Sequence, residues 1–349
     1  MQRRDQRNSS MDILRLFACF LVVFLHMAAE RSFIGAVTPA WRVYNIYGTA
    51  ARSCVPLFMM LSGSLFLGKR EMPGMKQLFG KYILKILILY LVWGLLYSAD
   101  DAGMTVLLAG DWRAILHRFL FSPKSHLWYL PCLVGLYMML PCMWAIARYQ
   151  DGKYLGYTCL MFFVFGILRN TLFVFLPADS MIYPLVSRIT FTFSDYCGYF
   201  LLGYYLSRDP KFVMNPLISG ALAVAVIVGA CWLADAQAVR SGIPSNPLLE
   251  YLMLPAFLEA SLIFITFRNC KFSFSPKTTA LLAKLSRATL FVYLFHIFAM
   301  QHLMIWFGIH TDSFCQILSV PVLSVVVYVF SLAVGCLLMK IPFVNKWLI

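Results

Sequence analysis

Apolar residues in this chain gather in long runs that are almost free of charge, separated by short polar segments. Ten of these runs are long enough to cross a bilayer as helices, at about 11–30, 46–68, 79–99, 127–147, 155–176, 189–206, 215–235, 248–267, 285–307 and 314–339. The intervening loops are too short to hold a separate soluble domain. The pattern predicts an all-α polytopic membrane protein in which residues 1–349 form one domain.

Composition agrees with a membrane protein. Hydrophobic residues make up 61% of the chain and charged residues 13%, whereas soluble domains carry about 25% charged residues. The net charge of +14 would suit a nucleic-acid-binding protein. The basic residues lie between the apolar runs, however, so the charge indicates membrane topology, with the lipid bilayer as partner and no nucleic acid.

Basic residues are concentrated in alternate loops, which sets the expected orientation. They occur in the N-terminal tail and in the segments 69–85, 148–153, 208–211, 268–287 and 340–346. Cytoplasmic loops carry the excess of Lys and Arg in membrane proteins. We therefore expect both termini on the cytoplasmic side. The connection 99–125 mixes charged and aromatic residues, which is typical of an amphipathic interfacial segment.

Two ionisable residues in the first run, Arg15 and His26, are candidate functional residues. They are eleven positions apart, so on a helix they share one face, roughly 16 Å apart along the axis. Ionisable groups inside a membrane normally face a protein interior or a water-filled cavity. The alternative is that Arg15 extends to the cytoplasmic interface and His26 to the outer headgroups.

Other polar residues fall within later runs or at their ends. Arg52 opens the second run, Asp195 lies six residues into the sixth from the outer side, and Glu259 is near the middle of the eighth. A carboxylate at that depth is either paired or protonated. His126 and Trp128 open the fourth run at the outer side, where they could also belong to an aromatic belt.

The ninth run places His296 at mid-membrane, where a histidine is rarely chosen for packing. With His26 and the outer polar residues it predicts a polar cavity. No HxxxH or HxxE cluster is present, so no metal is expected. At the inner end of the third run, Lys81 and Lys85 share a helix face and suit either ordinary membrane anchoring or a phosphorylated ligand.

Several motifs together resemble the acyltransferase-3 family of integral-membrane acyltransferases, over essentially the whole chain. The most specific is Arg-x10-His, here Arg15 and His26. The others are VPLFMMLSGSLF, HLWYLPCLVGLYMMLP, YFLLGYYL and LSRATLFVYLFHIF. The HLWYL form is similar to the branch that contains the enterobacterial common-antigen O-acetyltransferase. The family often carries an Arg-x-x-Arg pair at the inner end of the third run; with Lys85 at the second position, Tyr82 takes the first and Lys81 lies beside it, so the bidentate guanidinium contact is lost.

The resemblance implies an O-acetyltransferase of the bacterial cytoplasmic membrane. It would take an acetyl group from cytoplasmic acetyl-CoA to a hydroxyl of a cell-surface or lipid-linked glycan on the outer side. Arg15, Lys81 and Lys85 would bind the phosphates of coenzyme A. His26 would act as general base, since histidine titrates near neutral pH. Arg52 would stabilise an oxyanion or bind the glycan.

Second candidates for the site are His296 for catalysis and His126, Trp128, Asp195 and Glu259 for substrate binding. Asp195, Glu259 or a water could be the partner of His26. Ionisable groups inside the membrane are also found in proton-coupled transporters and flippases, so a carrier without acyl transfer is the main alternative. A non-catalytic membrane scaffold is the second. Two ionisable groups on one helix face argue against a scaffold.

Overall fold

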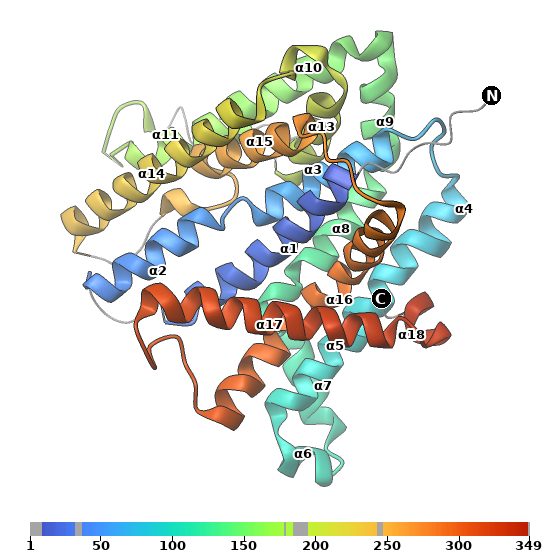
Figure 1. Ribbon diagram of the computed structural model, residues 1–349, viewed down its shortest axis with the longest axis vertical. Helices are drawn as coiled ribbons and strands as arrows, with labels where there is room; N and C mark the ends of the chain where they lie inside the picture. Colours follow the sequence, from blue (N-terminus) through green and yellow to red (C-terminus); the bar gives the residue numbers. More distant parts are fainter. Residues whose placement is uncertain (1–8, 32–36, 178, 184–194, 243–246, 348–349) are drawn as a thin grey trace.

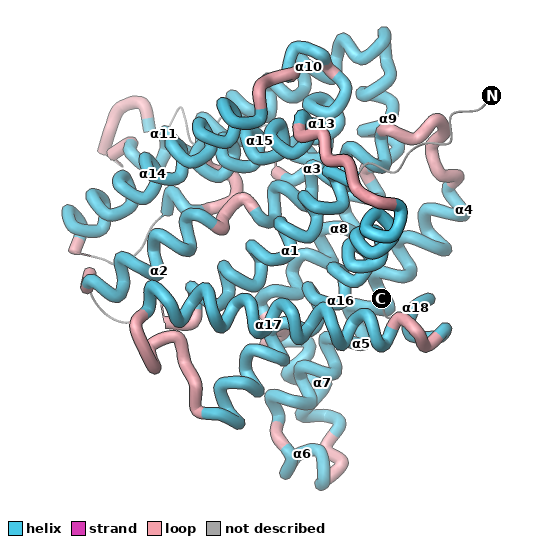
Figure 2. Tube along the Cα trace, viewed as in Figure 1, coloured by secondary structure: helices cyan, strands magenta, loops and turns pink. Residues whose placement is uncertain are grey.

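The computed structural model describes residues 9–31, 37–177, 179–183, 195–242 and 247–347. Every regular element within them is a helix (Figure 2), which confirms the predicted fold class. The unbroken long helices are α1 (Ser9–Ala29), α5 (Leu84–Ala102), α14 (Pro216–Ser241), α15 (Leu254–Asn269), α16 (Pro276–Phe307) and α17 (Gln316–Leu338).

The remaining helices are shorter or are joined through a distortion. They are α2 (Pro39–Ala50), α3 (Cys54–Leu67), α4 (Met75–Gln77), α6 (Met104–Leu108), α7 (Trp112–Phe121), α8 (Tyr129–Met138), α9 (Leu140–Arg148), α10 (Lys153–Met161), α11 (Arg169–Phe175), α13 (Tyr196–Arg208) and α18 (Pro342–Trp347). Two π-helical turns, Leu78–Ile83 and Phe162–Leu168, lead into α5 and α11. Short 3-10 turns cover Ser125–Trp128, Tyr149–Gly152, Pro210–Phe212 and Pro247–Leu249.

Eight helical stretches in the described residues are long and apolar enough to cross a membrane. Each of the ten predicted runs contains helix, although the first part of the sixth run lies outside the described residues. The count of ten crossings and the cytoplasmic side of the termini stay predictions. The amphipathic segment 99–125 folds as α6 and α7, which project from one end of the helical body (Figure 1).

The second predicted run is not one continuous helix. The turn Ala51–Ser53 separates α2 from α3, and Arg52 lies within this break. Pro56 follows four residues after Arg52. Proline has no N–H and its ring clashes with the carbonyl four residues earlier, so a regular helix could not continue through this point. Arg52 therefore lies in the turn that leads into α3.

Helix α1 lies at the centre of the fold and packs against α2, α3, α15, α16 and α17 (Figure 1). It runs parallel to α16: Ser10 Oγ donates to the carbonyl of Cys270, just before α16, and Cys19 Sγ donates to the carbonyl of Thr289 at 3.5 Å. Tyr328 OH of α17 donates to the carbonyl of Leu16 at 2.9 Å. These long-range contacts set which residues of α1 and α16 lie opposite each other.

The end of α1 that carries His26 is held by Glu30. Its carboxylate accepts hydrogen bonds from His310 Nδ1 at 3.0 Å and from the Thr311 backbone N–H at 3.2 Å. Arg31 Nε lies 3.2 Å from the same carboxylate. Since residues 308–315 join α16 to α17, these bonds tie the ends of three helices together.

Helices α3 and α13 approach each other closely because two glycines face the opposite backbone. A Cβ atom on Gly63 would lie 1.8 Å from the Phe200 carbonyl oxygen, and one on Gly203 would lie 2.0 Å from the Met60 oxygen. Small residues allow such close approach between membrane helices. Gly63 therefore serves the packing of α3 against α13.

We predict that Gly63→Ala will destabilise the protein, because its new methyl group would overlap the Phe200 backbone. Overpacking of this kind costs ~1–3 kcal/mol or more. The unfolding temperature of the purified protein in detergent measures the effect. Gly229→Ala is the matched control, since a Cβ there meets no atom within 4 Å. Equal unfolding temperatures for the two variants would contradict the packing role of Gly63.

Candidate active site

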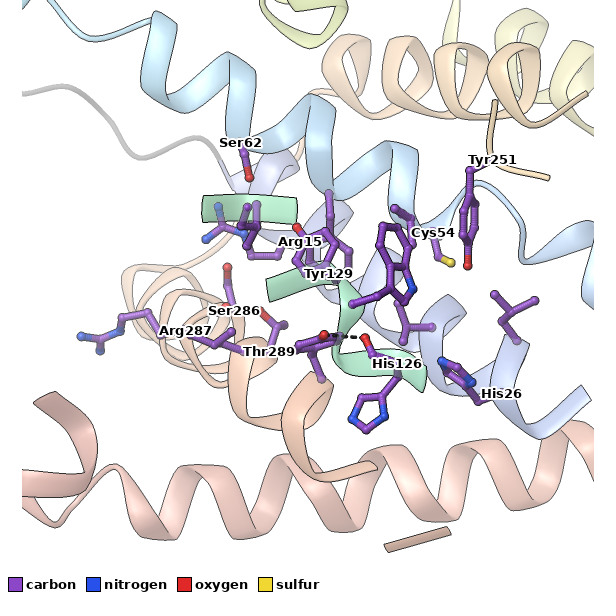
Figure 3. Close-up of a pocket in the computed structure, with 18 of the residues that line it drawn as sticks. Arg15, His26, Cys54, Ser62, His126, Tyr129, Tyr251, Ser286, Arg287 and Thr289 are labelled. Carbon is purple, nitrogen blue, oxygen red and sulfur yellow. Dashed lines mark hydrogen bonds between the residues drawn. The ribbon is translucent and has the colours of Figure 1, made fainter. Parts of the chain in front are cut away.

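A cavity of about 360 Å³ lies between α1, α3, α8 and α16. Arg15, Ser62, Ser286 and Arg287 lie toward one end of it, and His26 lies toward the other (Figure 3). Its aromatic and apolar lining includes Val22, Leu25, Phe58, Trp128, Tyr129, Leu133, Tyr137, Tyr251, Leu290 and Tyr293. The cavity therefore connects a cationic end with a histidine-bearing end, along the face of α1 that the sequence analysis predicted.

Three histidines from three separate elements meet at this second end. The ring centroid of His296 on α16 lies 5.1 Å from that of His26 on α1 and 5.4 Å from that of His126, which precedes α8. The rings of His26 and His126 are 6.2 Å apart. His26 and His126 line the cavity, and His296 is fully buried beside them. The structure thus brings together the three histidines that the sequence analysis named.

The tautomer of His296 follows from its hydrogen bonds. Nδ1 lies 3.1 Å from the carbonyl oxygen of Val292 and 2.8 Å from that of Tyr293. Carbonyl oxygens only accept hydrogen bonds, so Nδ1 carries the proton. Nε2 is then a lone-pair acceptor, and it is buried without a hydrogen-bond partner among the described residues. This free lone pair belongs to the ring nearest His26.

Tyrosines hold His126 in place. Tyr293 OH donates to the backbone carbonyl of His126 at 2.7 Å. The Tyr97 ring packs edge-on against the His126 ring, with centroids 5.1 Å apart. His126 is only 4% exposed, and its Nε2 has no hydrogen-bond partner in the described part of the chain. The short turn before α8 is thus anchored to α5 and α16.

The other end of the cavity holds two arginines. Arg15 is partly buried on α1, and Arg287 is exposed on α16. The buried hydroxyl of Ser286 has no hydrogen-bond partner among the described residues. Guanidinium groups suit phosphate and carboxylate ligands. This end is equipped to bind the anionic part of a ligand whose other part extends toward the histidines.

The structure does not bring Lys81 and Lys85 to the cavity. Lys81 is exposed beside the Tyr82 ring, Lys85 is partly buried on α5, and neither lines the cavity. The sequence analysis treated Arg287 only as one of the basic residues that set the membrane orientation. Its place at the same end of the cavity as Arg15 depends on the register of α16 against α1. The sequence carries no signal for this register beyond the LSRATLF motif.

Arg52 does not line the cavity itself but contacts a residue that does. Its guanidinium carbon is 5.2 Å from the centroid of the Tyr251 ring, and Tyr251 lines the cavity. Arg52 Nε is buried and has no hydrogen-bond partner among the described residues. The Trp128 ring stacks on the Tyr251 ring, with 6.0 Å between their centroids. Arg52 and Trp128 therefore both pack against Tyr251, an aromatic residue of the cavity wall.

Glu259 is buried in α15, where the Ser53 hydroxyl donates to its carboxylate at 2.7 Å. It does not line the cavity. Its position favours the structural interpretation of this residue over direct contact with substrate.

The predicted position of Asp195 within a helix is wrong. Its φ of 62° is incompatible with a right-handed helix, and α13 begins at the next residue. Asp195 is exposed and is not part of the cavity lining. Its neighbour Tyr196 packs against Trp128, with centroids 5.3 Å apart. Asp195 therefore stands near the rim of the site rather than beside His26.

Among the described residues, no group of three or more His, Cys, Asp or Glu side chains is placed to hold a metal ion.

Comparison with protein families decides the class. A family model described as an acyltransferase domain, acyltransferase-3, matches residues 8–340. The chain belongs to the acyltransferase-3 family. No curated protein and no solved structure matches it. Membership of this family, together with the apolar helices, indicates a multi-pass membrane acyltransferase.

We predict that Ser53→Ala will destabilise this acyltransferase, because the Glu259 carboxyl group loses its side-chain donor in a buried position. The Ser53 backbone N–H also bonds this carboxyl group, so the loss is that of one buried hydrogen bond, ~0.5–1.5 kcal/mol. The unfolding temperature in detergent measures the loss. Ser64→Ala is the control, since that hydroxyl bonds only the Leu61 carbonyl of its own helix. Unchanged stability of Ser53→Ala would show that Glu259 does not depend on this bond.

Proposed function

We propose that this acyltransferase moves an acetyl group from cytoplasmic acetyl-CoA to a hydroxyl of a cell-surface or lipid-linked glycan on the outer side of the bacterial cytoplasmic membrane. The observation that carries the proposal is the single cavity with Arg15 toward one end and His26 toward the other. Such a cavity would let a donor and an acceptor enter from opposite sides and meet at the histidines.

The size of the cavity supports a divided donor site. At about 360 Å³ it is near the lower limit of the roughly 300–1,000 Å³ typical of small-molecule pockets. It suits the acyl-bearing arm of coenzyme A, while the nucleotide would stay at the cytoplasmic mouth. Arg287 is exposed at that mouth and would bind the phosphates together with Arg15. Lys81 and Lys85 would add only to the basic surface around it.

His26 is proposed as the general base. It would take the proton of the acceptor hydroxyl while that oxygen attacks the thioester carbonyl carbon. The new carbon–oxygen bond forms, the carbon–sulfur bond breaks, and the thiolate of coenzyme A leaves and is protonated. A protonated His26 has an N–H to donate, and His296 Nε2 is the free acceptor beside it. His296 would thus stabilise the charged form of His26.

The outer residues would bind the acceptor. The stacked rings of Trp128 and Tyr251 line the cavity, and His126 lies beside His26. Aromatic faces suit the apolar side of a sugar ring. Arg52 behind Tyr251 would supply positive charge toward a developing oxyanion or an anionic sugar. Asp195 would contribute at the rim, and Glu259 by holding the Arg52–Ser53 turn.

The decisive experiment uses inside-out vesicles that contain native envelope glycans and supplies radiolabelled acetyl-CoA on the cytoplasmic side. We predict that His26→Ala will reduce label in the glycan by about 10²–10⁴-fold, the usual contribution of a general base.

His302→Ala is the matched control. His302 also lies on α16, but it pairs with Asp100, with 3.3 Å between Nε2 and Oδ1, and it does not line the cavity. Its labelling should stay near that of the wild type. Undiminished labelling by His26→Ala would exclude this residue as the base. Absence of label from the wild type, with uptake of unmodified solute into proteoliposomes, would favour the carrier.

The donor site has its own prediction. Arg287→Ala should raise KM for acetyl-CoA about tenfold or more, because a hydrogen bond to a charged group contributes ~1.5–3 kcal/mol. The value of kcat should change little, since the lost contact binds ground state and transition state alike. Lys284→Ala, on the same helix but away from the cavity lining, should leave KM unchanged. Equal effects of the two variants would place the phosphates elsewhere.

A further inference from the structure

A second cavity, also about 360 Å³, lies between α5, α16, α17 and α18. Its walls are aromatic and aliphatic and include Trp93, Phe291, Phe295, Phe298 and Leu338. The rings of Phe291 and Phe295 stack with centroids 5.1 Å apart. We refer to this cavity as the apolar groove. Its lining suits a hydrocarbon chain.

Tyr97 stands between the apolar groove and the histidines. It lines the groove, and its ring lies 5.1 Å from that of His126, which lines the first cavity. The side chain is 2% exposed. The Tyr97 ring therefore lies between the apolar groove and His126, whose own ring borders the histidine end of the active-site cavity.

Tyr97 is also held rigidly. Its hydroxyl donates to the carbonyl of Leu294 at 2.8 Å and accepts from the backbone N–H of Phe298 at 3.1 Å. Both partners belong to α16, the helix that carries His296. The ring cannot swing aside without breaking these two buried hydrogen bonds. It is built as a fixed wall.

We infer that Tyr97 determines acyl-chain length: its ring stops the acyl group at the histidine cluster and keeps longer chains out of the apolar groove. The inference rests on the proposed function and goes beyond it, since it names the residue that restricts the donor to short acyl groups. An acetyl group at His26 ends before the wall. A longer acyl tail would have to pass the Tyr97 ring.

Replacing Tyr97 with alanine removes the ring between the apolar groove and His126, so that the groove extends to the histidine end of the first cavity. A tail that reaches the groove leaves water for apolar surroundings, and each buried methylene group should then favour binding about fourfold, equivalent to ~0.8 kcal/mol. A hexanoyl group has four methylene groups more than an acetyl group. The relative preference for hexanoyl over acetyl donors should therefore rise at least tenfold, even if several of these groups are imperfectly packed.

The test reconstitutes the full chain in proteoliposomes and compares acetyl-, butyryl-, hexanoyl- and octanoyl-CoA with one acceptor. The readout is the ratio of kcat/KM for hexanoyl-CoA to that for acetyl-CoA. This ratio should be low for the wild type and at least tenfold higher for Tyr97→Ala. Tyr97→Val is a second opening variant, in case the alanine variant folds poorly.

Two control variants distinguish the effect of removing the Tyr97 ring from a general loosening of the helix packing. Tyr97→Phe keeps the ring and loses only the two hydroxyl bonds, so its ratio should rise much less than that of Tyr97→Ala. Phe295→Ala removes an aromatic ring of the groove without opening the wall, since Phe295 packs on Phe291, Phe298 and Phe330. Its ratio should also stay low.

A ratio unchanged in both opening variants, or raised equally by Phe295→Ala, would overturn the inference. Efficient use of hexanoyl-CoA by the wild type would do the same. A second readout needs no turnover: the unfolding temperature of the protein measures the binding of non-hydrolysable acetyl and hexanoyl thioether analogues of coenzyme A. If no variant transfers any acyl group, the proposed function fails, and selective gain of hexanoyl-analogue binding in Tyr97→Ala would still support the wall.

Discussion

The structure depends on the parallel packing of α1 against α16. Ionisable side chains within apolar helices are expensive to place in a bilayer, so they must meet one another or a polar cavity. The contact of Cys19 with Thr289 marks the register that side-chain packing gives the two helices. In that register His26 faces His296, and Arg15 and Arg287 both reach the cavity. One helix pair thus provides both ends of the site.

The surrounding helices keep this pair in place and shape the cavity. Gly63 and Gly203 let α3 approach α13 at backbone distance, and α3 supplies Phe58 and Ser62 to the cavity wall. Beyond His26, Glu30 ties α1 to the segment between α16 and α17. Rigid supports of this kind matter because catalytic groups must be held within a fraction of an ångström of productive geometry.

Around the histidines the protein uses aromatic side chains in two distinct ways. Tyr293 and Tyr97 make hydrogen bonds to backbone groups, and so fix His126 and the relation of α5 to α16. Trp128 and Tyr251 instead stack on each other in the wall of the cavity. The first kind of aromatic residue sets the limits of the site, and the second kind offers a surface to a ligand. This division is consistent with a site that must hold a small reacting group firmly and a larger acceptor loosely.

The sequence by itself determined the helical membrane architecture, because apolar runs of spanning length have no stable alternative in a bilayer. It also determined that Arg15 and His26 share a helix face, since helical periodicity is local, and its motifs indicated the family. Tertiary structure alone decided what meets that face. Contacts between segments far apart in the chain bring His126 and His296 to His26 and bring Arg287 to the cavity. The same contacts leave Lys81 and Lys85 out of the cavity lining and Asp195 exposed. Helical periodicity orients residues around one axis, but only side-chain packing sets the register and rotation of one helix against another.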